Sequence, residues 1–566
     1  MKNKEKIWKN IKFIIIAFLL SLFACQRYLN NMMIYTHDLG YHLNRIMQIS
    51  TGLKNGVFPI LIHSGLLHNL GYANPLFYPE LFLYIPAIIM NVLSLHVLTA
   101  YKLFLIIITF FTFLSMYYVT KKIFGKKEIA YLSSFLYIFS LYRITDIYVR
   151  GALGELLAFI FVPLLIYGLY NVIFEDSKKW YLICFGFWGL INSHILTFAI
   201  VIPVILLICL FNIDIIFKNK KIFVKLLIVA ILSVLLCIGF VGPMLEQKSV
   251  GKYKVDDHDV DTSEALLERA NSLSMTFSSS VKSGYAVDSS VRDDGLSSGI
   301  GGILIVLAAL VFLRKNINYK ENRFEIQGLI IGFLMLIMTT KIFPWKHLPF
   351  LTIVQFPYRL NLFPTLFFAL IGAKNYYELF ENKKDACIIL GLLIVILSGI
   401  TLSNITLNFN PAIYQTFEDL IDINKGVDRE VGNGEYLPDS VDKTNLDLEL
   451  YNINDKEHKI DFTRNNSTVE FEYNLNENDF ELNVPLIYYK GYVAYIKDNN
   501  GNTTKLEVLR NKENGEVLIK SDKNLSGIVT VEYKMTIIQK ISYIISIISF
   551  IIIVYIFVKE TKNRVA

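Results

Sequence analysis

The feature that most constrains this chain is a series of long apolar runs with almost no charged residues, which recur from one end to the other. A helix needs about 20 predominantly apolar residues to cross the hydrocarbon core of a bilayer. Hydrophobic residues make up 54% of the chain and the mean hydropathy is +0.45, which is more apolar than a soluble domain. The sequence therefore predicts a mostly helical membrane protein that crosses the bilayer about a dozen times.

Lysine and arginine residues cluster in the short loops between these runs, and the net charge of +6 is modest. Such clusters mark the cytoplasmic loops of membrane proteins and differ from the broad basic face of a nucleic-acid-binding protein. They place both termini in the cytoplasm. The expected spans lie near residues 12–29, 98–119, 129–145, 153–173, 180–191, 195–213, 222–242, 299–313, 326–340, 361–379, 386–403 and 537–558.

Three apolar stretches leave alternatives open. Residues 81–95 are short, and counting them as a span would put a lysine-rich loop at 121–127 outside, so we expect a helix at the membrane surface. Cleavage of a signal before Cys25 is the alternative for the first span, although Phe23 fits that processing motif poorly. The stretch 180–191 is too short to cross alone, and we expect a break near Ser193-His194.

Residues 404–536 have a different pattern. Asn500-Gly501 and Asn514-Gly515 lie between short segments in which apolar and polar residues alternate, which is typical of strands joined by hairpins. The five segments are 467–473, 480–484, 505–509, 516–519 and 528–533. We expect residues 1–403 to form a transmembrane domain with an outer segment at 30–97. An extracytoplasmic β-sandwich follows at 404–536, and 537–566 form a last helix with a cytoplasmic tail. Residues 243–298 read as a mobile outer loop.

Charged residues stand out at three places near the expected outer ends of the spans. Asp38, His42 and Arg45 are spaced to share one face of a helix. A carboxylate beside an imidazole and a guanidinium suits a general base close to an anionic substrate. The alternative is an amphipathic helix with a solvated polar face.

The second group is Asp146, Arg150 and Glu155, between two expected spans. Charges at such positions are costly unless they pair or face water, so an ion-pair network that fixes the loop is the alternative to a substrate site. The third group is Gln355 and Arg359, at the start of another span, where an arginine can bind a lipid phosphate. The alternative is an anchor for ordinary headgroups.

Weaker candidates are His194, at the expected helix break, and Glu435, at the start of the β-rich region. The histidines match no compact zinc site. The five cysteines lie in apolar segments, so a disulfide framework is not expected. No phosphate-binding loop, dinucleotide fingerprint or serine elbow is present. The motifs therefore indicate no cofactor, and a divalent cation stays possible.

Six ordered motifs together resemble a bacterial family catalogued as "6-pyruvoyl-tetrahydropterin synthase-related" membrane proteins, which is similar to the YfhO-like group. The layout also resembles the GT-C glycosyltransferases, in which acidic residues of the first two outer loops are essential. The motifs are Asp38-Leu-Gly-Tyr-His42-Leu-Asn-Arg45, Asn74-Pro-Leu-Phe-Tyr-Pro79, Asp146-Ile-Tyr-Val-Arg150-Gly-Ala-Leu-Gly-Glu155, Ser193-His194, Gln355-Phe-Pro-Tyr-Arg359 and Gly434-Glu435-Tyr-Leu-Pro438.

This resemblance implies an inverting glycosyltransferase of the bacterial cell membrane, with Asp38 and Asp146 as catalytic residues. The donor would be a polyprenyl-phosphate-linked sugar, and the acceptor an envelope polymer or glycolipid. Substrate-binding roles would fall to His42, Arg45, Arg150, Glu155, His194, Gln355, Arg359 and Glu435. A transporter or flippase of lipid-linked sugars and a noncatalytic envelope-assembly protein are the alternatives.

Overall fold

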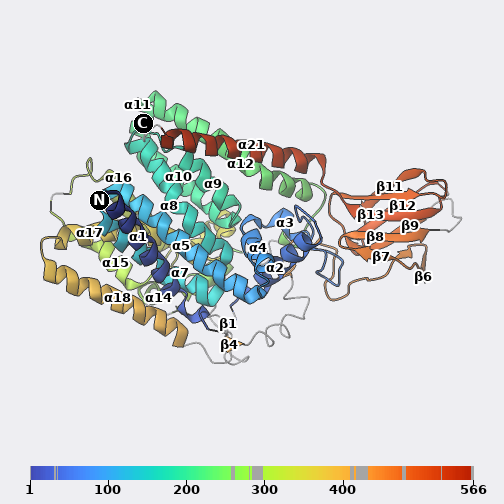
Figure 1. Cartoon of the computed structure of the whole chain (residues 1–566), viewed down its shortest axis with the longest axis horizontal. Helices are drawn as coiled ribbons and strands as arrows, with labels where there is room; N and C mark the ends of the chain where they lie inside the picture. Colours follow the sequence, from blue (N-terminus) through green and yellow to red (C-terminus); the bar gives the residue numbers. More distant parts are fainter. Residues whose placement is uncertain are drawn as a thin grey trace.

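Apolar helices form a bundle, and a sheet of strands lies beyond one end of it (Figure 1). This computed structural model describes residues 2–30, 33–34, 36–256, 262–278, 281–282, 297–315, 317–407, 414–415, 431–473, 480–523 and 525–562. The main helices of the bundle are α1 (Lys2–Ala24), α5 (Val97–Phe124), α6 (Lys127–Ile138), α8 (Leu153–Phe174), α9 (Tyr181–Ile191), α10 (Ile195–Phe211), α12 (Lys220–Lys248), α15 (Gly302–Ala309), α16 (Arg323–Met338), α17 (Leu362–Phe380), α18 (Lys384–Leu407) and α21 (Ile537–Lys562).

Each expected span overlaps one of these helices, although the spans near 12–29 and 129–145 run past the ends of α1 and α6. The predicted fold class, a mostly helical membrane protein with a β-rich domain near the C-terminus, is confirmed. By length and composition, five helices among the described residues could cross a membrane: α5, α8, α12, α18 and α21. The most apolar part of α8 is 83% buried, whereas those of α18 and α21 are only 22% and 17% buried. Helix α8 is therefore central, and α18 and α21 present apolar side chains outward, as lipid-facing helices do. The number of crossings and their orientation stay predictions.

The segment between α1 and α5 caps the end of the bundle nearest the sheet (Figure 1). It contains α2 (Leu39–Lys54), α3 (Asn74–Phe77) and α4 (Tyr84–Val92), and both α2 and α4 pack on α5. Helix α4 has 9 residues, about half the length that a span requires. The structure thus shows a short helix near residues 81–95, and its place at the membrane surface stays a prediction.

The prediction of a mobile loop at 243–298 is wrong for much of its described part. Helix α12 continues to Lys248, and α13 (Ser263–Arg269) and α14 (Leu273–Phe277) follow. Thr262 and Ser272 cap these two short helices by accepting hydrogen bonds from backbone N–H groups. The sequence pattern did not predict them, because a helical periodicity becomes visible only over more residues than either helix contains.

Nine of the described strands of the β-rich domain form one sheet in the order β6-β5-β9-β12-β11-β10-β13-β8-β7, in which every neighbouring pair is antiparallel. Strand β4 (Tyr414–Gln415) pairs instead with β1 (Met33–Ile34), which follows the first helix. Strand β11 pairs with β10 on one side and β12 on the other, so the two layers expected of a sandwich are continuous and form a half-barrel. The strands are β5 (Tyr451–Asn452), β6 (Asp455–Lys459), β7 (Thr463–Asn465), β8 (Thr468–Tyr473), β9 (Phe480–Ile487), β10 (Tyr492–Lys497), β11 (Thr503–Arg510), β12 (Glu516–Ser521) and β13 (Gly527–Tyr533).

Candidate functional site

Two segments that are far apart in sequence meet through their backbones. The N–H of His37 donates to the carbonyl of Val149 at 3.1 Å, and the N–H of Asp38 donates to that of Arg150 at 2.8 Å. Gly151 has a φ of +66°, and a Cβ atom there would overlap the Thr36 side chain. Only glycine fits this conformation and this close approach. The junction places Asp38 directly beside the second charged group.

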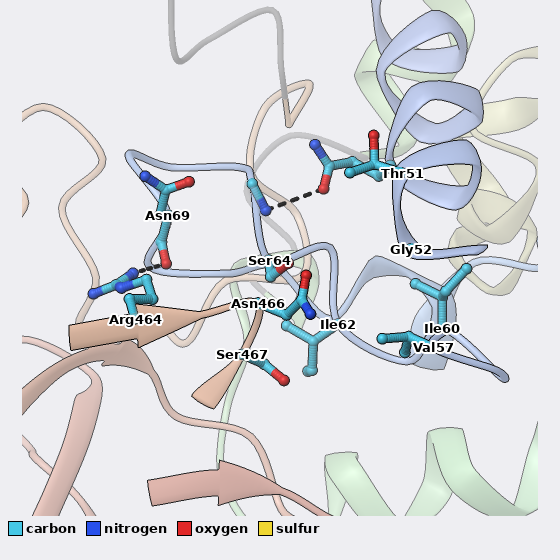
Figure 2. A pocket seen from close by; sticks show the side chains of 12 residues that line it. Thr51, Gly52, Val57, Ile60, Ile62, Ser64, Asn69, Arg464, Asn466 and Ser467 are labelled. Carbon is cyan, nitrogen blue, oxygen red and sulfur yellow. Dashed lines mark hydrogen bonds between the residues drawn. The ribbon is translucent and has the colours of Figure 1, made fainter. Parts of the chain in front are cut away.

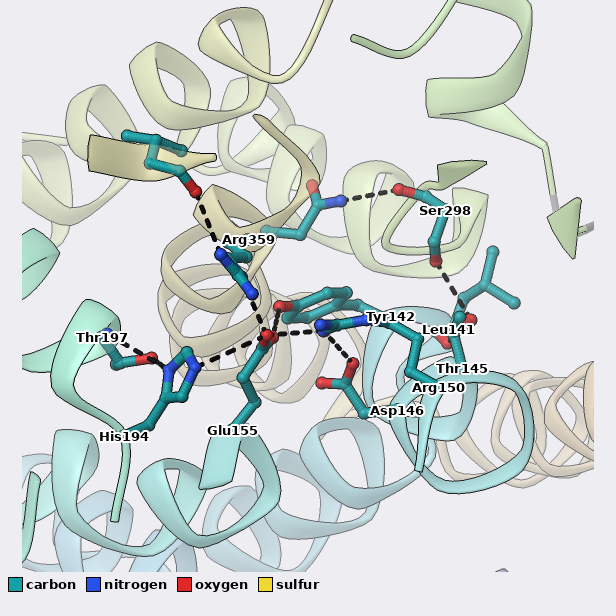
Figure 3. A network of polar contacts seen from close by, with 12 residues as sticks. Leu141, Tyr142, Thr145, Asp146, Arg150, Glu155, His194, Thr197, Ser298 and Arg359 are labelled. Carbon is teal, nitrogen blue, oxygen red and sulfur yellow. Dashed lines mark hydrogen bonds and ion pairs between the residues drawn. The ribbon is translucent and has the colours of Figure 1, made fainter. Parts of the chain in front are cut away.

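Glu155 is the centre of that group (Figure 3). It lies in the first turn of α8 and is 3% exposed. Its Oε1 atom lies 2.6 Å from Nη1 of Arg150, 3.0 Å from Nε of Arg359 and 4.0 Å from Nε2 of His194. Its Oε2 accepts a hydrogen bond from Tyr142. One carboxylate thus joins four side chains from three separate segments, and the sequence had singled out three of the four: Arg150, His194 and Arg359.

Asp146 lies behind Arg150 and is fully buried. Its Oδ1 atom is 3.0 Å from Nη1 of Arg150, whereas its Oδ2 atom has no hydrogen-bond partner. Burial and the neighbouring Glu155 carboxylate raise the pKa of Asp146, against the opposing effect of Arg150. The structure therefore brings Asp146 into the cluster as a support for Arg150, away from solvent.

Asp38 is the more accessible acid of the group, since it is half-buried. It directly precedes α2 and makes no capping hydrogen bond from its side chain. Burial raises the pKa of Asp38; Arg150 and Arg359 oppose that rise, whereas Glu155 adds to it. The Asp38 carboxylate is thus within electrostatic reach of both arginines, as a base beside an anion-binding site should be.

The other two members of the first motif contact each other and the segment between α1 and α5. Arg45 is 1% exposed, donates to Glu80 at 2.8 Å and to the carbonyl of Pro79 at 2.6 Å, and lies against the ring of Tyr78. His42 is buried, 3.3 Å from Arg45. Burial disfavours the charged form of Glu80, but His63 and Arg45 outweigh it and lower its pKa. Arg45 therefore has an internal partner.

Sequence reasoning missed that partner, Glu80. The available signal was a single carboxylate directly after the Asn74–Pro79 motif, in a stretch otherwise rich in aromatic and apolar residues. An acid in such surroundings requires a buried cation or hydrogen-bond donors. His63 supplies a second contact at 3.0 Å, so the outer segment is held together by its own ion pairs.

The segment that leads into the β-rich domain also reaches the site. The ring of Tyr436 stacks on Phe77 with centroids 5.3 Å apart, and its N–H donates to the hydroxyl of Tyr72 at 3.1 Å. Burial raises the pKa of the half-buried Glu435, and Asp38 contributes to that rise. Glu435 therefore lies within electrostatic range of Asp38, in a turn of the chain.

Gln355 shapes the other side of the cluster. Its φ of +57° is uncommon for a residue with a side chain, and its Oε1 accepts from Arg359 at 2.7 Å. Arg269 donates to the carbonyl of Gln355 at 2.9 Å, and the guanidinium groups of Arg269 and Arg359 both lie about 5 Å from the ring of Phe356. Sequence reasoning missed Arg269, because the segment that carries it was read as a loop.

His194 occupies the predicted break between two helices. It caps α10, with Nδ1 2.8 Å from the Thr197 hydroxyl. A Cβ atom at Gly154 would lie 2.8 Å from the Ser193 carbonyl oxygen and 2.9 Å from the Tyr78 hydroxyl. Because Gly154 has no side chain, the break between α9 and α10 can lie close to the segment between α1 and α5, beside Glu155. Among the residues that the structure describes, no group of three or more His, Cys, Asp and Glu side chains could hold a metal ion.

Residues 6–354 match the "Family of unknown function (DUF6541)". The chain belongs to this family. The DUF6541 match covers Asp38, Asp146, Glu155 and His194 but ends one residue before Gln355. It does not confirm the resemblance to the "6-pyruvoyl-tetrahydropterin synthase-related" and YfhO-like proteins.

Two other proteins are similar to this DUF6541 member. An "Uncharacterized protein" of Lactococcus lactis subsp. cremoris (strain MG1363) is 25% identical over 605 residues, which span 98% of this chain and 96% of the relative. A cryo-EM structure of the arabinofuranosyltransferase AftD from mycobacteria aligns with a TM-score of 0.44 and 10% identity. That alignment covers 69% of this chain and 27% of the mycobacterial chain.

Proposed function

We propose that this protein is a membrane glycosyltransferase of the GT-C type. The observation that carries the proposal is the meeting of a half-buried carboxylate, Asp38, with two arginines, Arg150 and Arg359, at the end of apolar helices. A transferase that uses a lipid-phosphate sugar needs a base for the acceptor and fixed cations for the departing phosphate. This arrangement offers both within one cluster.

In the proposed reaction, Asp38 accepts the proton of an acceptor hydroxyl. The oxygen attacks the anomeric carbon and forms the new glycosidic bond, while the bond from that carbon to the phosphate oxygen breaks. The electron pair leaves with the polyprenyl phosphate. Attack from the side opposite the phosphate inverts the anomeric centre. Arg359, whose side chain is 10% exposed, and Arg150 stabilise the charge that develops on the phosphate.

The acids behind the arginines have a positioning role in this proposal. Asp146 and Glu155 both contact Arg150, and Glu155 also contacts Arg359. A guanidinium held in advance need not be reoriented when the phosphate charge develops. We assign Asp146 to holding Arg150, because its buried carboxylate is poorly placed to touch a substrate.

The surroundings of the cluster support a lipid-linked donor and a membrane location. Glu155 begins the apolar helix α8, and His194 precedes the apolar helix α10. A polyprenyl chain can lie along such helices while its phosphate stays at their ends. We therefore propose a bacterial cell-membrane enzyme with the cluster and the β-rich domain outside. The acceptor would be an envelope polymer or glycolipid.

The test is transfer of labelled sugar from a polyprenyl-phosphate donor to envelope glycan in vesicles that contain the full-length protein. Asp38→Asn should lower the transfer rate at least a hundredfold, because the amide cannot accept the proton. Asp522→Asn, at an exposed position of the β-rich domain, is the matched control and should transfer at the parent rate.

Two outcomes would count against the proposal. Transfer by Asp38→Asn at the parent rate would remove Asp38 as the base. Movement of the lipid-linked sugar across the vesicle membrane, without any transfer, would favour the transporter alternative.

A further inference from the structure

A cavity of about 360 Å³ lies between the outer segment of the helical bundle and the edge of the sheet (Figure 2). Its volume falls within the range of about 300–1,000 Å³ that small-molecule sites occupy. The candidate site contributes none of its walls. The lining residues are Gln48, Thr51, Gly52, Val57, Ile60, Ile62, Ser64, Gly65, Asn69, Arg464, Asn466 and Ser467.

Direct contacts hold the two sides of the cavity together. The turn between β7 and β8 reaches the end of α2, where Nδ2 of Asn55 donates to Oδ1 of Asn466 at 2.9 Å. Arg464 donates to the carbonyl oxygen of Asn69 and, at 2.8 Å, to that of Pro485. The side chain of Arg464 thus links the outer segment to the sheet, so the cavity is a fixed feature of this junction.

The chemistry of the lining indicates an uncharged ligand. Amide and hydroxyl groups come from Gln48, Thr51, Ser64, Asn69, Asn466 and Ser467, while Val57, Ile60 and Ile62 add apolar surface. Amides and hydroxyls both donate and accept hydrogen bonds. Among the described residues that line the cavity there is no carboxylate, and the guanidinium of Arg464 already contacts two carbonyl groups. A sugar, with hydroxyl groups and C–H faces, matches this lining better than a phosphate does.

Helix α2 connects the cavity to the candidate site. Asp38 immediately precedes this helix, whereas Gln48 and Thr51 lie in its second half. At about 1.5 Å of rise per residue, they are roughly 15–20 Å from Asp38 along the axis. A ligand of several sugar units could therefore occupy the cavity and still place one end near Asp38.

We propose that this cavity binds an uncharged stretch of the acceptor glycan, several sugar units away from the hydroxyl group that is glycosylated. This assignment rests on the proposed transferase function and adds the class of acceptor, a neutral oligosaccharide. It also gives the β-rich domain a role, because the turn between β7 and β8 supplies one wall.

Binding is measured separately from transfer, with full-length protein in nanodiscs and fluorescent neutral oligomers of glucose, galactose or mannose. Ser64→Trp and Ser467→Trp fill the cavity from opposite walls and should each weaken binding at least tenfold. The smaller change Thr51→Ala should weaken it about threefold without steric stress. Thr503→Trp, at an exposed position of β11, should bind like the parent.

The outcomes separate this assignment from the proposed function. Sugar transfer without measurable binding of any neutral oligomer would overturn the cavity assignment and leave the transferase standing. Unchanged binding by both tryptophan variants, or preferred binding of an anionic polymer such as polygalacturonate, would also overturn it. Binding that depends on the cavity, in a protein that transfers no sugar, would support the cavity and reject the transferase.

Discussion

Arg359 and Glu155 are 204 residues apart in the chain, yet Nε of Arg359 lies 3.0 Å from Oε1 of Glu155. The same carboxylate oxygen lies 2.6 Å from Arg150. A single buried acid therefore fixes two arginines that come from different parts of the bundle. Removing one partner of such a buried pair leaves an uncompensated charge, which costs about 3–5 kcal/mol.

The change Glu155→Gln should destabilise the protein by about 3 kcal/mol, because the guanidinium of Arg359 loses its counter-charge and that of Arg150 keeps only Asp146. Thermal unfolding of the detergent-solubilised protein measures the effect. Glu128→Gln is the control, since the side chain of Glu128 is 50% exposed beside Lys127 and should matter little. Equal melting temperatures for Glu155→Gln and the parent would show that Glu155 does not stabilise the cluster.

Gly154→Ala should lower both the melting temperature and sugar transfer. The added methyl group would meet the Ser193 carbonyl oxygen at 2.8 Å, and a backbone atom in a packed site cannot easily move away. Gly399→Ala in α18 meets nothing within 4 Å, and alanine favours a helix by about 1 kcal/mol. The second variant should therefore be as stable as the parent or more so. If the two variants behave alike, the close approach at Gly154 has no consequence.

Because of Glu80, we expect the folded protein to lose stability in acid. Its pKa in the folded protein is lowered, so its stabilising effect is present above about pH 4.3, where an unfolded glutamate titrates. That stability is lost as the pH falls through the lower folded pKa. Glu80→Gln should already be less stable at neutral pH and should lose less on acidification. Melting temperatures between pH 7 and pH 3 measure this, and parallel curves for the two proteins would contradict it.

Because of Glu516, we expect the stability of the sheet to depend on pH in the opposite direction. Burial raises its pKa to about 8, and Asn483 donates to its Oε2 atom at 2.6 Å. The unfolded chain releases this proton near pH 4.3, so the sheet should become less stable as the pH rises from about 5 to 8. Glu516→Gln should remove that slope. Hydrogen exchange of β9 and β12 in the full-length protein, corrected for the intrinsic effect of pH, measures it. If the slope of stability against pH persists in Glu516→Gln, another group must cause it.

The sequence by itself determined where the helices and most strands lie. Hydropathy and charge set the positions of the apolar helices, and alternation with Asn-Gly turns predicted five of the strands from β8 to β13. These signals are local, because each depends on residues within a few turns or one hairpin. It also singled out Asp38, Asp146, Arg150, Glu155 and Arg359, since charges beside apolar runs require a partner or a function.

Only the tertiary structure decided which of these residues meet. Sequence spacing put Arg45 on one face with Asp38, whereas packing gives it Glu80 as a buried partner. Arg359 reaches Glu155 because α8 and the segment before α17 lie together in the bundle. The cavity likewise exists only where the turn between β7 and β8 meets the outer segment. Contacts across hundreds of residues depend on how elements pack, and the periodicity of one element carries no information about its neighbours.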